Sequence, residues 1–251
     1  MSSPAAAESE DQYLYGIVLA TAELPSGLQG VQGHPVRLLE SGRVAAVVSD
    51  AEPEEVLGTP DNLLAHTRLL DALAAETPVL PLAFGTVVPG AEAVTADVLE
   101  PGEEEYHAGL EDVSGRVQYT VAVTFDRDTV MREIVQEVPE VAELRTAIAG
   151  TSEDQTRPQR IRLGELMVQA FEEKQPAAAE PVLERLERVT VRMAVQEQRQ
   201  PEDVVQAAVL VAEADTEVFE EELEDLGAAF HPRLKFRLVG PQAPYDFVPE
   251  V

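Results

Sequence analysis

VQYTVAVTF, residues 117–125, carries the most regular strand pattern in the chain and does most to define its fold. Val117, Tyr119, Val121, Val123 and Phe125 alternate with polar or small residues. A period of two residues turns one set of side chains toward one face of a sheet, so the segment is predicted to be a half-buried strand. A chain of 251 residues has room around such a strand for one large or two modest domains.

After this strand the sequence predicts helices followed by further strands. The last helix is predicted from an apolar stripe at helical spacing, which consists of Phe219, Leu223, Leu226 and Phe230. Asp215 is expected to cap this helix, and the acidic residues 220–225 form its other face. Other helices are expected at 129–149, 158–174 and, restarting after Pro176, 177–188. Strands are expected at 189–196, 204–212 and 233–239. The polar stretch 150–157 is predicted to be a mobile loop.

Before residue 117 the pattern is similar, with one helix missing. A strand at 13–20 leads into a loop with proline and glycines at 24–34, and two short strands at 36–40 and 44–49 form a hairpin. Asp61 is expected to cap a helix that ends near Glu76, with an apolar face formed by Leu63, Leu70, Leu73 and Ala74. Residues 79–88 read as one apolar strand, and 95–112 as a helix broken at Pro101 and Gly102.

The order of these elements predicts an α+β protein with two ferredoxin-like (split βαβ) domains. In the N-terminal domain a loop takes the place of the first helix. The expected boundaries are a disordered tail at 1–11, the modified N-terminal domain at 12–113, and the C-terminal domain with a proline- and aromatic-containing tail at 114–251.

Composition excludes several classes of function. The formal net charge of −29 disfavours nucleic acid and anionic lipid surfaces, since both repel an acidic protein. No stretch approaches the roughly 18 apolar residues of a membrane span, and the acidic start does not look like a signal peptide, so a cytoplasmic location is expected. The charge itself fits either general solubility or solubility lent to an apolar partner.

The sequence contains no motif for catalysis, cofactor binding or metal binding. It has no cysteine, and its four histidines are scattered, with His66 read as a core histidine satisfied by a backbone carbonyl. The acidic pairs are expected on solvated faces, and no phosphate-binding glycine loop or hydrolase nucleophile motif is present. We therefore expect no catalytic, cofactor or metal site, no small-molecule substrate, and a binding role rather than an enzymatic one.

Two segments are neither polar loop nor simple core. The first is Pro81–Thr86 (PLAFGT), in which Phe84 is expected to be buried; the second is Gly240–Phe247 (GPQAPYDF), a rigid stretch prone to polyproline II geometry. The second either packs against its own domain or faces a partner. The candidate interaction residues are Pro81, Phe84, Gly85, Pro241, Pro244, Tyr245 and Phe247.

With these two segments the chain resembles the GvpL/GvpF family of gas vesicle proteins. The resemblance includes YLYGIV at 13–18, AAVVS at 45–49 and Ala65-His66, and it runs in order over nearly the whole chain. The family pattern usually has Arg where Ala83 stands and a second proline where Ala243 stands, so what that Arg does elsewhere is not done by the same residue here.

The resemblance implies an accessory or minor structural protein of gas vesicles. Such a protein would bind the hydrophobic shell protein, limit its aggregation and aid vesicle nucleation, and other accessory proteins are further candidate partners. Whether the chain is of the L or the F type is not readable from the sequence. Two alternatives remain at this point, a ferredoxin-like ligand-binding regulator or enzyme, and an acidic spacer without a selective partner.

Overall fold

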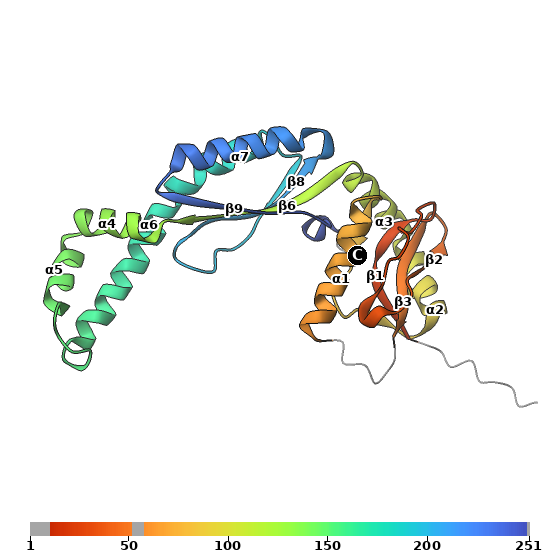
Figure 1. Ribbon diagram of the computed structural model, residues 1–251, viewed down its shortest axis with the longest axis horizontal. Helices are drawn as coiled ribbons and strands as arrows, with labels where there is room; N and C mark the ends of the chain where they lie inside the picture. Colours follow the sequence, from red (N-terminus) through yellow and green to blue (C-terminus); the bar gives the residue numbers. More distant parts are fainter. Residues whose placement is uncertain (1–10, 52–57, 250–251) are drawn as a thin grey trace, which may run out of the picture. The chain divides into compact units, whose positions relative to one another are not determined.

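Two sheets organise the chain, which is described here from a computed structural model covering residues 11–51 and 58–249. The first sheet contains β1 (Asp11–Leu19), β2 (Arg37–Ser41), β3 (Val44–Ala51), β4 (Val79–Pro81) and β5 (Val87–Val88), and the second contains β6 (Arg116–Phe125), β7 (Arg192–Val195), β8 (Asp203–Ala212) and β9 (Leu234–Gln242). Their orders are β2-β3-β1-β4, with β5 also paired to β1, and β7-β8-β6-β9, and the pairings are antiparallel. The chain is therefore an α+β protein with two antiparallel sheets (Figure 1).

The chain divides into two units, each with its own sheet. Unit 1 comprises residues 1–118 and 241–251, and unit 2 comprises 119–240. The segment after residue 240 is predicted to belong to the second domain, whereas its contacts group it with unit 1. The tail predicted at 1–11 lies outside the described residues except for Asp11, which is the first residue of β1.

In unit 1, β1 is buried along nearly its whole length and pairs with β3, β4 and β5. The predicted hairpin is present, with Ser41 opposite Val44 and Gly42 in the left-handed region at φ 58°. The single strand predicted at 79–88 is instead divided into β4 and β5, because the chain turns at Ala83–Thr86 and returns to β1.

Helix α1 (Pro60–Ala74) differs in two ways from its prediction. Its N-cap is Thr59, whose side-chain oxygen accepts from the backbone N–H of Asn62, while Asp61 lies in the first turn. Its buried face holds Asn62, His66, Leu69, Leu70 and Leu73, and Leu63 is exposed. Proline at the first helical position moves the start, and hence the cap, by two residues relative to the prediction.

The helix predicted at 95–112 is longer and is not broken. It comprises α2 (Gly90–Ala93), a π-helical turn η2 (Val94–Leu99) and α3 (Glu100–Val113). Pro101 falls in the first turn of α3, where a missing N–H is tolerated, and Gly102 packs under the ring of Tyr106. Gly115, at φ 64°, lies two residues after the end of α3.

Unit 2 contains the helices α4 (Arg127–Glu137), α5 (Pro139–Ile148), α6 (Arg157–Glu187) and α7 (Thr216–Phe230). Helices α4 and α5 pack against α6, whereas α6 and α7 pack on the sheet. The odd-numbered residues of β6 meet them: Tyr119 contacts Phe219 at 5.1 Å and Phe125 contacts Phe171 at 5.8 Å between ring centroids. The strand predicted from residues 117–125 is thus confirmed, together with the inward direction of its alternating side chains.

Two predictions in unit 2 are wrong in detail. Pro176 does not restart a helix, because α6 runs through both Pro176 and Pro181 as one helix of 31 residues. Asp215 precedes α7 as expected, but its side chain makes no capping hydrogen bond. The segment 150–157 contains a short 3-10 turn at Asp154–Thr156.

Candidate functional site

Helix α1 is where the two unusual segments of the sequence meet. Phe84 packs edge-on against His66, with ring centroids 5.6 Å apart. From the other segment, the backbone N–H of Ala243 donates to Asp71 Oδ1 at 2.9 Å, one turn and a half further along α1. Residues that are some 160 positions apart in the sequence are therefore held by one helix within unit 1.

An aromatic cluster lies under this meeting point. Tyr13 and Tyr15, both fully buried on β1, contact each other at 4.8 Å between ring centroids, and His66 stacks on Tyr15 at 5.6 Å. Phe84 contacts Tyr13 at 6.5 Å and is itself half-buried rather than fully buried as predicted. The chain turn at Ala83–Thr86 leaves one side of the Phe84 ring at the surface, which explains the difference.

Polar groups inside the cluster connect the turn to α1. The Gly85 N–H donates to the Tyr13 hydroxyl at 2.9 Å, and that hydroxyl lies 3.1 Å from His66 Nδ1. The Tyr13 hydroxyl therefore connects the turn to the His66 ring, and the tautomer of His66 sets which of the two groups donates in the Tyr13–His66 hydrogen bond. Gly85 has φ 86°, a backbone conformation that side chains rarely adopt, so glycine is required to aim this N–H.

Burial sets the protonation of both partners. It lowers the pKa of His66 below 6.5, partly offset by the Leu82 carbonyl, and raises the pKa of Tyr13 to about 12. His66 Nε2 has no hydrogen-bond partner of good geometry among the described residues. The prediction of a buried core histidine is confirmed, but its main partner is a tyrosine hydroxyl rather than a carbonyl.

Tyr15 fixes the loop with glycines at 27–33 in a similar way. Its hydroxyl accepts from the Val31 N–H at 2.7 Å and lies 2.9 Å from Ser49 Oγ. A Cβ atom on Gly30 would lie 2.3 Å from that hydroxyl, so only glycine fits. The loop that replaces the expected first helix is thus attached to the core of unit 1 by a specific contact.

The C-terminal segment packs on its own unit. Ala243 and Phe247 are buried, and Asp246 exchanges two hydrogen bonds with the side chain of Gln118, at 2.7 and 3.1 Å. Tyr245 is 37% exposed, bonds the hydroxyl of Thr67 on α1, and has its pKa raised by burial to about 12. Phe247 is therefore packed within the chain, but on unit 1 and not on the C-terminal domain to which the sequence analysis assigned the segment, while Tyr245 keeps part of its ring at the surface.

The structure brings together some, but not all, of the predicted interaction residues. Pro81 is buried opposite Gly16 of β1, Pro244 is buried, and Pro241 is exposed at the end of β9. Ala83, where the family pattern has Arg, is exposed, and Ala243, where it has proline, is in the core. The sequence analysis did not identify Tyr13, Tyr15 and Asp71, although an opening strand with two tyrosines two positions apart was a usable signal.

A half-exposed apolar surface covers this cluster. We call it the α1 patch and define it as Leu63, Phe84 and Tyr245. Leu63 is 48% exposed and lies one turn before His66 and Thr67, which contact Phe84 and Tyr245 respectively. Leu64 is also exposed, at 46%, but points about 100° away around the helix.

The candidate site contains one buried histidine below partly exposed apolar side chains. His66 is buried and its Nδ1 is occupied, so it is not available as a base. Among residues 11–51 and 58–249, no group of acidic or histidine side chains is placed to hold a metal ion, and no helix is long and apolar enough to cross a membrane. A cleft of about 470 Å³ lies between the loop at Gly27–Gly33 and the first half of α1, and none of the three patch residues lines it.

Comparison with known proteins agrees over nearly the full length. A family model described as "Gas vesicle synthesis protein GvpL/GvpF" matches residues 12–249. Gas vesicle protein F of Streptomyces sp. (strain CB03234) is 32% identical over 248 residues, which cover 94% of this chain and 98% of that protein. Gas vesicle protein L1 of Halobacterium salinarum is 28% identical over 266 residues, which cover 97% and 92%.

A solved structure has the same fold. The crystal structure of the gas vesicle protein GvpF from Anabaena sp. PCC7120 matches with a TM-score of 0.79 at 22% identity. The match covers 97% of this chain and all of that one, at 100%. At this identity the similarity concerns the architecture, including both sheets.

Proposed function

The chain belongs to the GvpL/GvpF family of gas vesicle proteins, and from this premise we propose that it is an accessory or minor structural protein of gas vesicle assembly, without enzymatic activity. In this proposal it binds the hydrophobic shell protein in the cytoplasm and at the gas vesicle, limits its aggregation and aids nucleation. The observation that carries the proposal is the α1 patch, where Phe84 and Tyr245, one from each family segment, contact the consecutive α1 residues His66 and Thr67. The exposed Leu63 lies one turn before them on the same helix.

The rigid base suits the patch to binding. Hydrogen bonds connect Tyr13 to His66 and to Gly85, so the turn that carries Phe84 is held in place before any partner arrives. Tyr245 is held separately, by its hydrogen bond to Thr67. Binding then orders few side chains, which reduces the entropy lost on association. An apolar subunit that has not yet assembled can cover this surface and gain hydrophobic free energy.

Strand addition offers a second contact to the same partner. β2 and β4 are the outer strands on the path of the first sheet, and β7 and β9 are those of the second. An unassembled β-rich subunit exposes strand edges of its own, and pairing of such edges forms backbone hydrogen bonds whatever the side chains. The net charge of −29 keeps such complexes apart and in solution.

We also propose that each unit is a ferredoxin-like domain. Both sheets have the order second-third-first-fourth strand, counted within each unit, and this order supports the proposal. In unit 1 the loop at 20–36, with its tyrosine-bound turn, takes the place of the first helix.

The test compares two neighbouring leucines on α1. Leu63→Glu places a charge on the patch, whereas Leu64→Glu places the same charge on the adjacent side of the same helix at nearly equal exposure. We expect the wild-type chain to co-purify with shell subunit and to lower its light scattering, Leu63→Glu to lose both effects, and Leu64→Glu to keep them. Circular dichroism should show both variants folded.

Two results would contradict the proposal. If the folded wild-type chain neither binds shell subunit nor reduces its aggregation at any salt concentration, the function is wrong. If Leu63→Glu and Leu64→Glu lower binding equally, the function stands but the α1 patch is not the surface that performs it.

Charge is expected to affect the rate of binding more than its strength. Acidic residues on α7 attract Lys or Arg of a partner over a distance, so added salt should slow association while the equilibrium changes less. Glu220 and Glu221 are the residues to neutralise, because Glu222 forms an ion pair with Arg185 and its loss would disturb the packing of α6 on α7.

The remaining alternative is a small-molecule regulator, which would use the cleft of about 470 Å³ beside α1. Asp61, Asn62 and Arg68 supply its polar side chains on α1. A thermal-shift screen with metabolite mixtures would favour this alternative if one compound raised the melting temperature and Asn62→Ala abolished the shift.

A further inference from the structure

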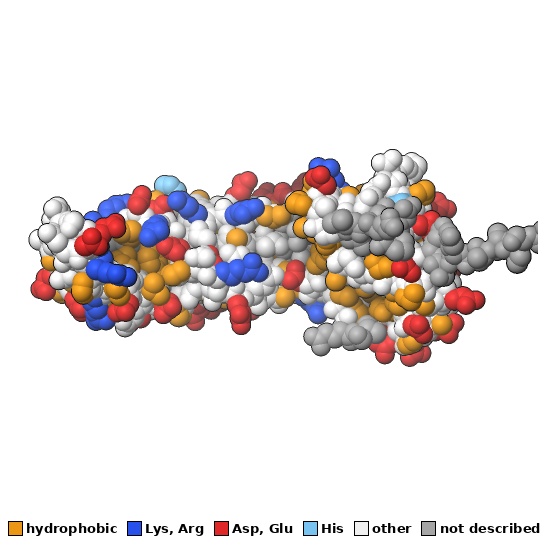
Figure 2. All heavy atoms as spheres, turned by 90° about the horizontal axis from the view of Figure 1, so that it is seen from below, with side chains coloured by type: hydrophobic (Ala, Val, Ile, Leu, Met, Phe, Trp, Pro, Cys, Tyr) orange, Lys and Arg blue, Asp and Glu red, His pale blue; other side chains and the backbone are white. Residues whose placement is uncertain are grey.

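Unit 2 contains an open apolar groove that the proposed function does not use. It lies between α4, α6 and the β7–β8 loop and has a volume of about 550 Å³. Its apolar lining consists of Met131, Ile148, Leu163, Met167, Val168 and Phe171. Phe171 forms a buried floor, and Val168 is 40% exposed at the surface. Figure 2 shows hydrophobic side chains gathered on one face of the α4–α6 part of the chain, with charged side chains around them.

A glycine in the middle of α6 opens this groove further. Gly164 is exposed, and a Cβ atom built on it would meet no atom within 4 Å. Glycine is a poor residue inside a helix, and here neither backbone conformation nor packing within the chain requires it. Its lack of a side chain leaves a notch between Leu163 and Met167 where the backbone of another helix can approach closely.

Methionines also mark the groove as adaptable. The chain has four methionines, and two of them, Met131 and Met167, face each other's helices across this one surface. Both are half-buried. Because methionine is unbranched and flexible, it adjusts to a partner's side chains better than a branched residue would.

The edge of the groove carries positive charge. Arg127 has a side chain that is 71% exposed and lies 3.6 Å from Glu202. Arg160 is held in place by Thr156 Oγ1 and the Thr151 carbonyl, both at 3.2 Å. Glu202 lines the same edge and is paired with Arg127, so two guanidinium groups and one carboxylate leave the edge with a net positive charge. Such an edge favours carboxylates, although the overall charge of −29 repels them.

We propose that this groove binds an amphipathic α-helix of a partner protein that carries Asp or Glu beside its apolar face. The apolar face would lie over Phe171 and the methionines, its backbone would approach at Gly164, and its carboxylates would reach Arg127 and Arg160. A second copy of this chain fits less well, because two highly acidic molecules repel each other. The proposal does not depend on the α1 patch, which lies in unit 1.

The test uses two designed helical peptides of about 18 residues, roughly five turns, with the same leucine and alanine face. One has glutamates and the other has lysines on the flanking positions, and each carries a fluorophore for anisotropy titration with the full chain. Attraction to net charge alone predicts that only the lysine peptide binds. The groove predicts saturable binding of the glutamate peptide, weakened at least fivefold by Arg127→Gln and by Val168→Glu.

Matched glycine substitutions give the sharpest comparison. Gly227 in α7 is also a helical glycine with nothing near its missing Cβ, and it lies outside the groove. Both Gly164→Ala and Gly227→Ala are expected to raise the melting temperature, since alanine favours a helix. Only Gly164→Ala is expected to weaken binding of the glutamate peptide, because its methyl group fills the notch.

Several outcomes would overturn the proposal. They are binding of the lysine peptide alone, binding of neither peptide, or binding of the glutamate peptide that Arg127→Gln, Val168→Glu and Gly164→Ala all leave unchanged. Self-association that is abolished by Val168→Glu in analytical ultracentrifugation would assign the groove to a second copy instead. Failure of shell-protein binding at the α1 patch would leave this result untouched, so the two proposals can fail separately.

Discussion

Unit 1 and unit 2 have the same strand order but build their interiors from different aromatic residues. Four of the five tyrosines and three of the four histidines are in unit 1, whereas five of the seven phenylalanines are in unit 2. Tyrosine and histidine bring a polar atom into the core and need a partner there, while phenylalanine needs none. Unit 1 therefore has a hydrogen-bonded core that fixes two loops, and unit 2 has an aliphatic and phenylalanine core.

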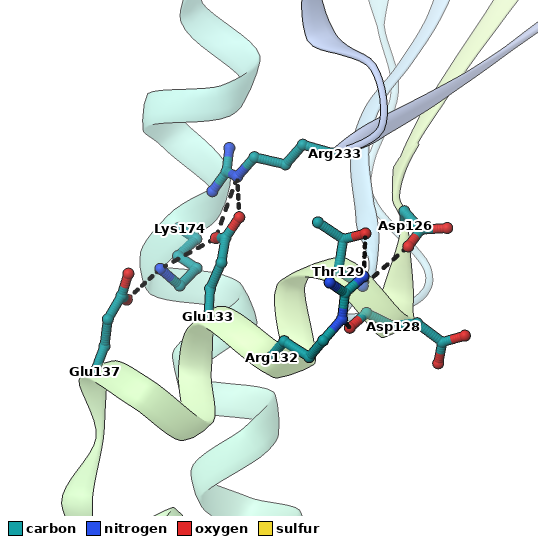
Figure 3. Close-up of polar contacts among 8 residues, drawn as sticks. All are labelled: Asp126, Asp128, Thr129, Arg132, Glu133, Glu137, Lys174 and Arg233. Carbon is teal, nitrogen blue, oxygen red and sulfur yellow. Dashed lines mark hydrogen bonds and ion pairs between the residues drawn. The ribbon is translucent and has the colours of Figure 1, made fainter.

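Positively charged residues are concentrated in unit 2. Unit 1 contains four of the eighteen Lys and Arg residues, and unit 2 contains fourteen. In unit 2 these residues connect elements at the edge of the core. Figure 3 shows Lys174 of α6 between Glu133 and Glu137 of α4, and Arg233 reaching Glu133 at 3.1 Å. The same architecture is thus stabilised by interior hydrogen bonds in one unit and by peripheral ion pairs in the other.

The largest expected effect comes from a matched pair of phenylalanines. Phe219→Ala removes a fully buried ring that packs on Tyr119 and should lower the free energy of unfolding by about 3–5 kcal/mol. Phe84→Ala removes a half-buried ring in unit 1 and should cost about 2 kcal/mol, roughly half the fully buried value. Urea denaturation followed by far-UV circular dichroism measures both, and equal losses would mean that Phe84 belongs to the core.

A matched pair of tyrosines tests the hydrogen-bonded core directly. Tyr13→Phe leaves His66 Nδ1 buried without its hydroxyl partner and should cost about 1–3 kcal/mol. Tyr119→Phe in unit 2 removes a contact to the partly exposed Thr216 hydroxyl at the start of α7. That hydroxyl keeps its hydrogen bond to the Glu213 carbonyl, so the substitution should cost less than about 1 kcal/mol. If the two substitutions are equally tolerated, the network in unit 1 contributes to binding geometry and not to stability.

The two units should lose stability in different pH ranges. The pKa of His66 is lowered in the folded state by burial, so the unfolded chain binds a proton more readily, and unit 1 loses stability as the pH falls below 6.5. In unit 2 the pKa of Asp126 is depressed chiefly by a hydrogen bond from Lys235, with Thr129 assisting. That stabilisation is present at neutral pH and is lost only as the pH falls below about 4, the range of a free Asp side chain.

Near-UV circular dichroism can follow this separation, because the tyrosine signal comes mainly from unit 1. In thermal melts at pH 7.5, 6.0 and 5.0, the tyrosine signal should be lost at progressively lower temperature. The temperature at which unit 2 loses its far-UV signal should change little over the same pH range. His66→Phe serves as the control and should flatten the dependence. Parallel loss of both signals at every pH would show that His66 does not set the acid response of unit 1.

The smallest expected effect is that of the ion pairs. Lys174→Met removes a cation, 18% exposed, that contacts two carboxylates and should cost about 1 kcal/mol, less in high salt. Arg43→Met breaks the more exposed pair with Glu103 in unit 1 and should change the denaturation midpoint less. Denaturation at low and at about 1 M salt measures the difference, and a larger effect of Arg43→Met would reverse the assignment of ionic stabilisation to unit 2.

The amino-acid sequence by itself determined the strands, the hairpin and most of the helices. Period-two alternation at 117–125 and the apolar stripe from Phe219 to Phe230 are local patterns, and a local pattern is enough to fix which face of an element is buried. The sequence also indicated the two unusual segments and, through them, the family. It could not fix the ends of elements that depend on one cap or turn, such as Thr59 before α1.

Only the tertiary structure decided how distant residues combine. Pro176 was predicted to interrupt a helix, yet packing keeps α6 continuous through it. The segment after residue 240 follows unit 2 in sequence but packs on α1 of unit 1, because Asp71 and Gln118 supply partners for its backbone. Pairings between residues far apart in sequence decide which tyrosine hydroxyl contacts His66 and which leucine of α1 stays at the surface. No periodicity along the chain encodes those pairings.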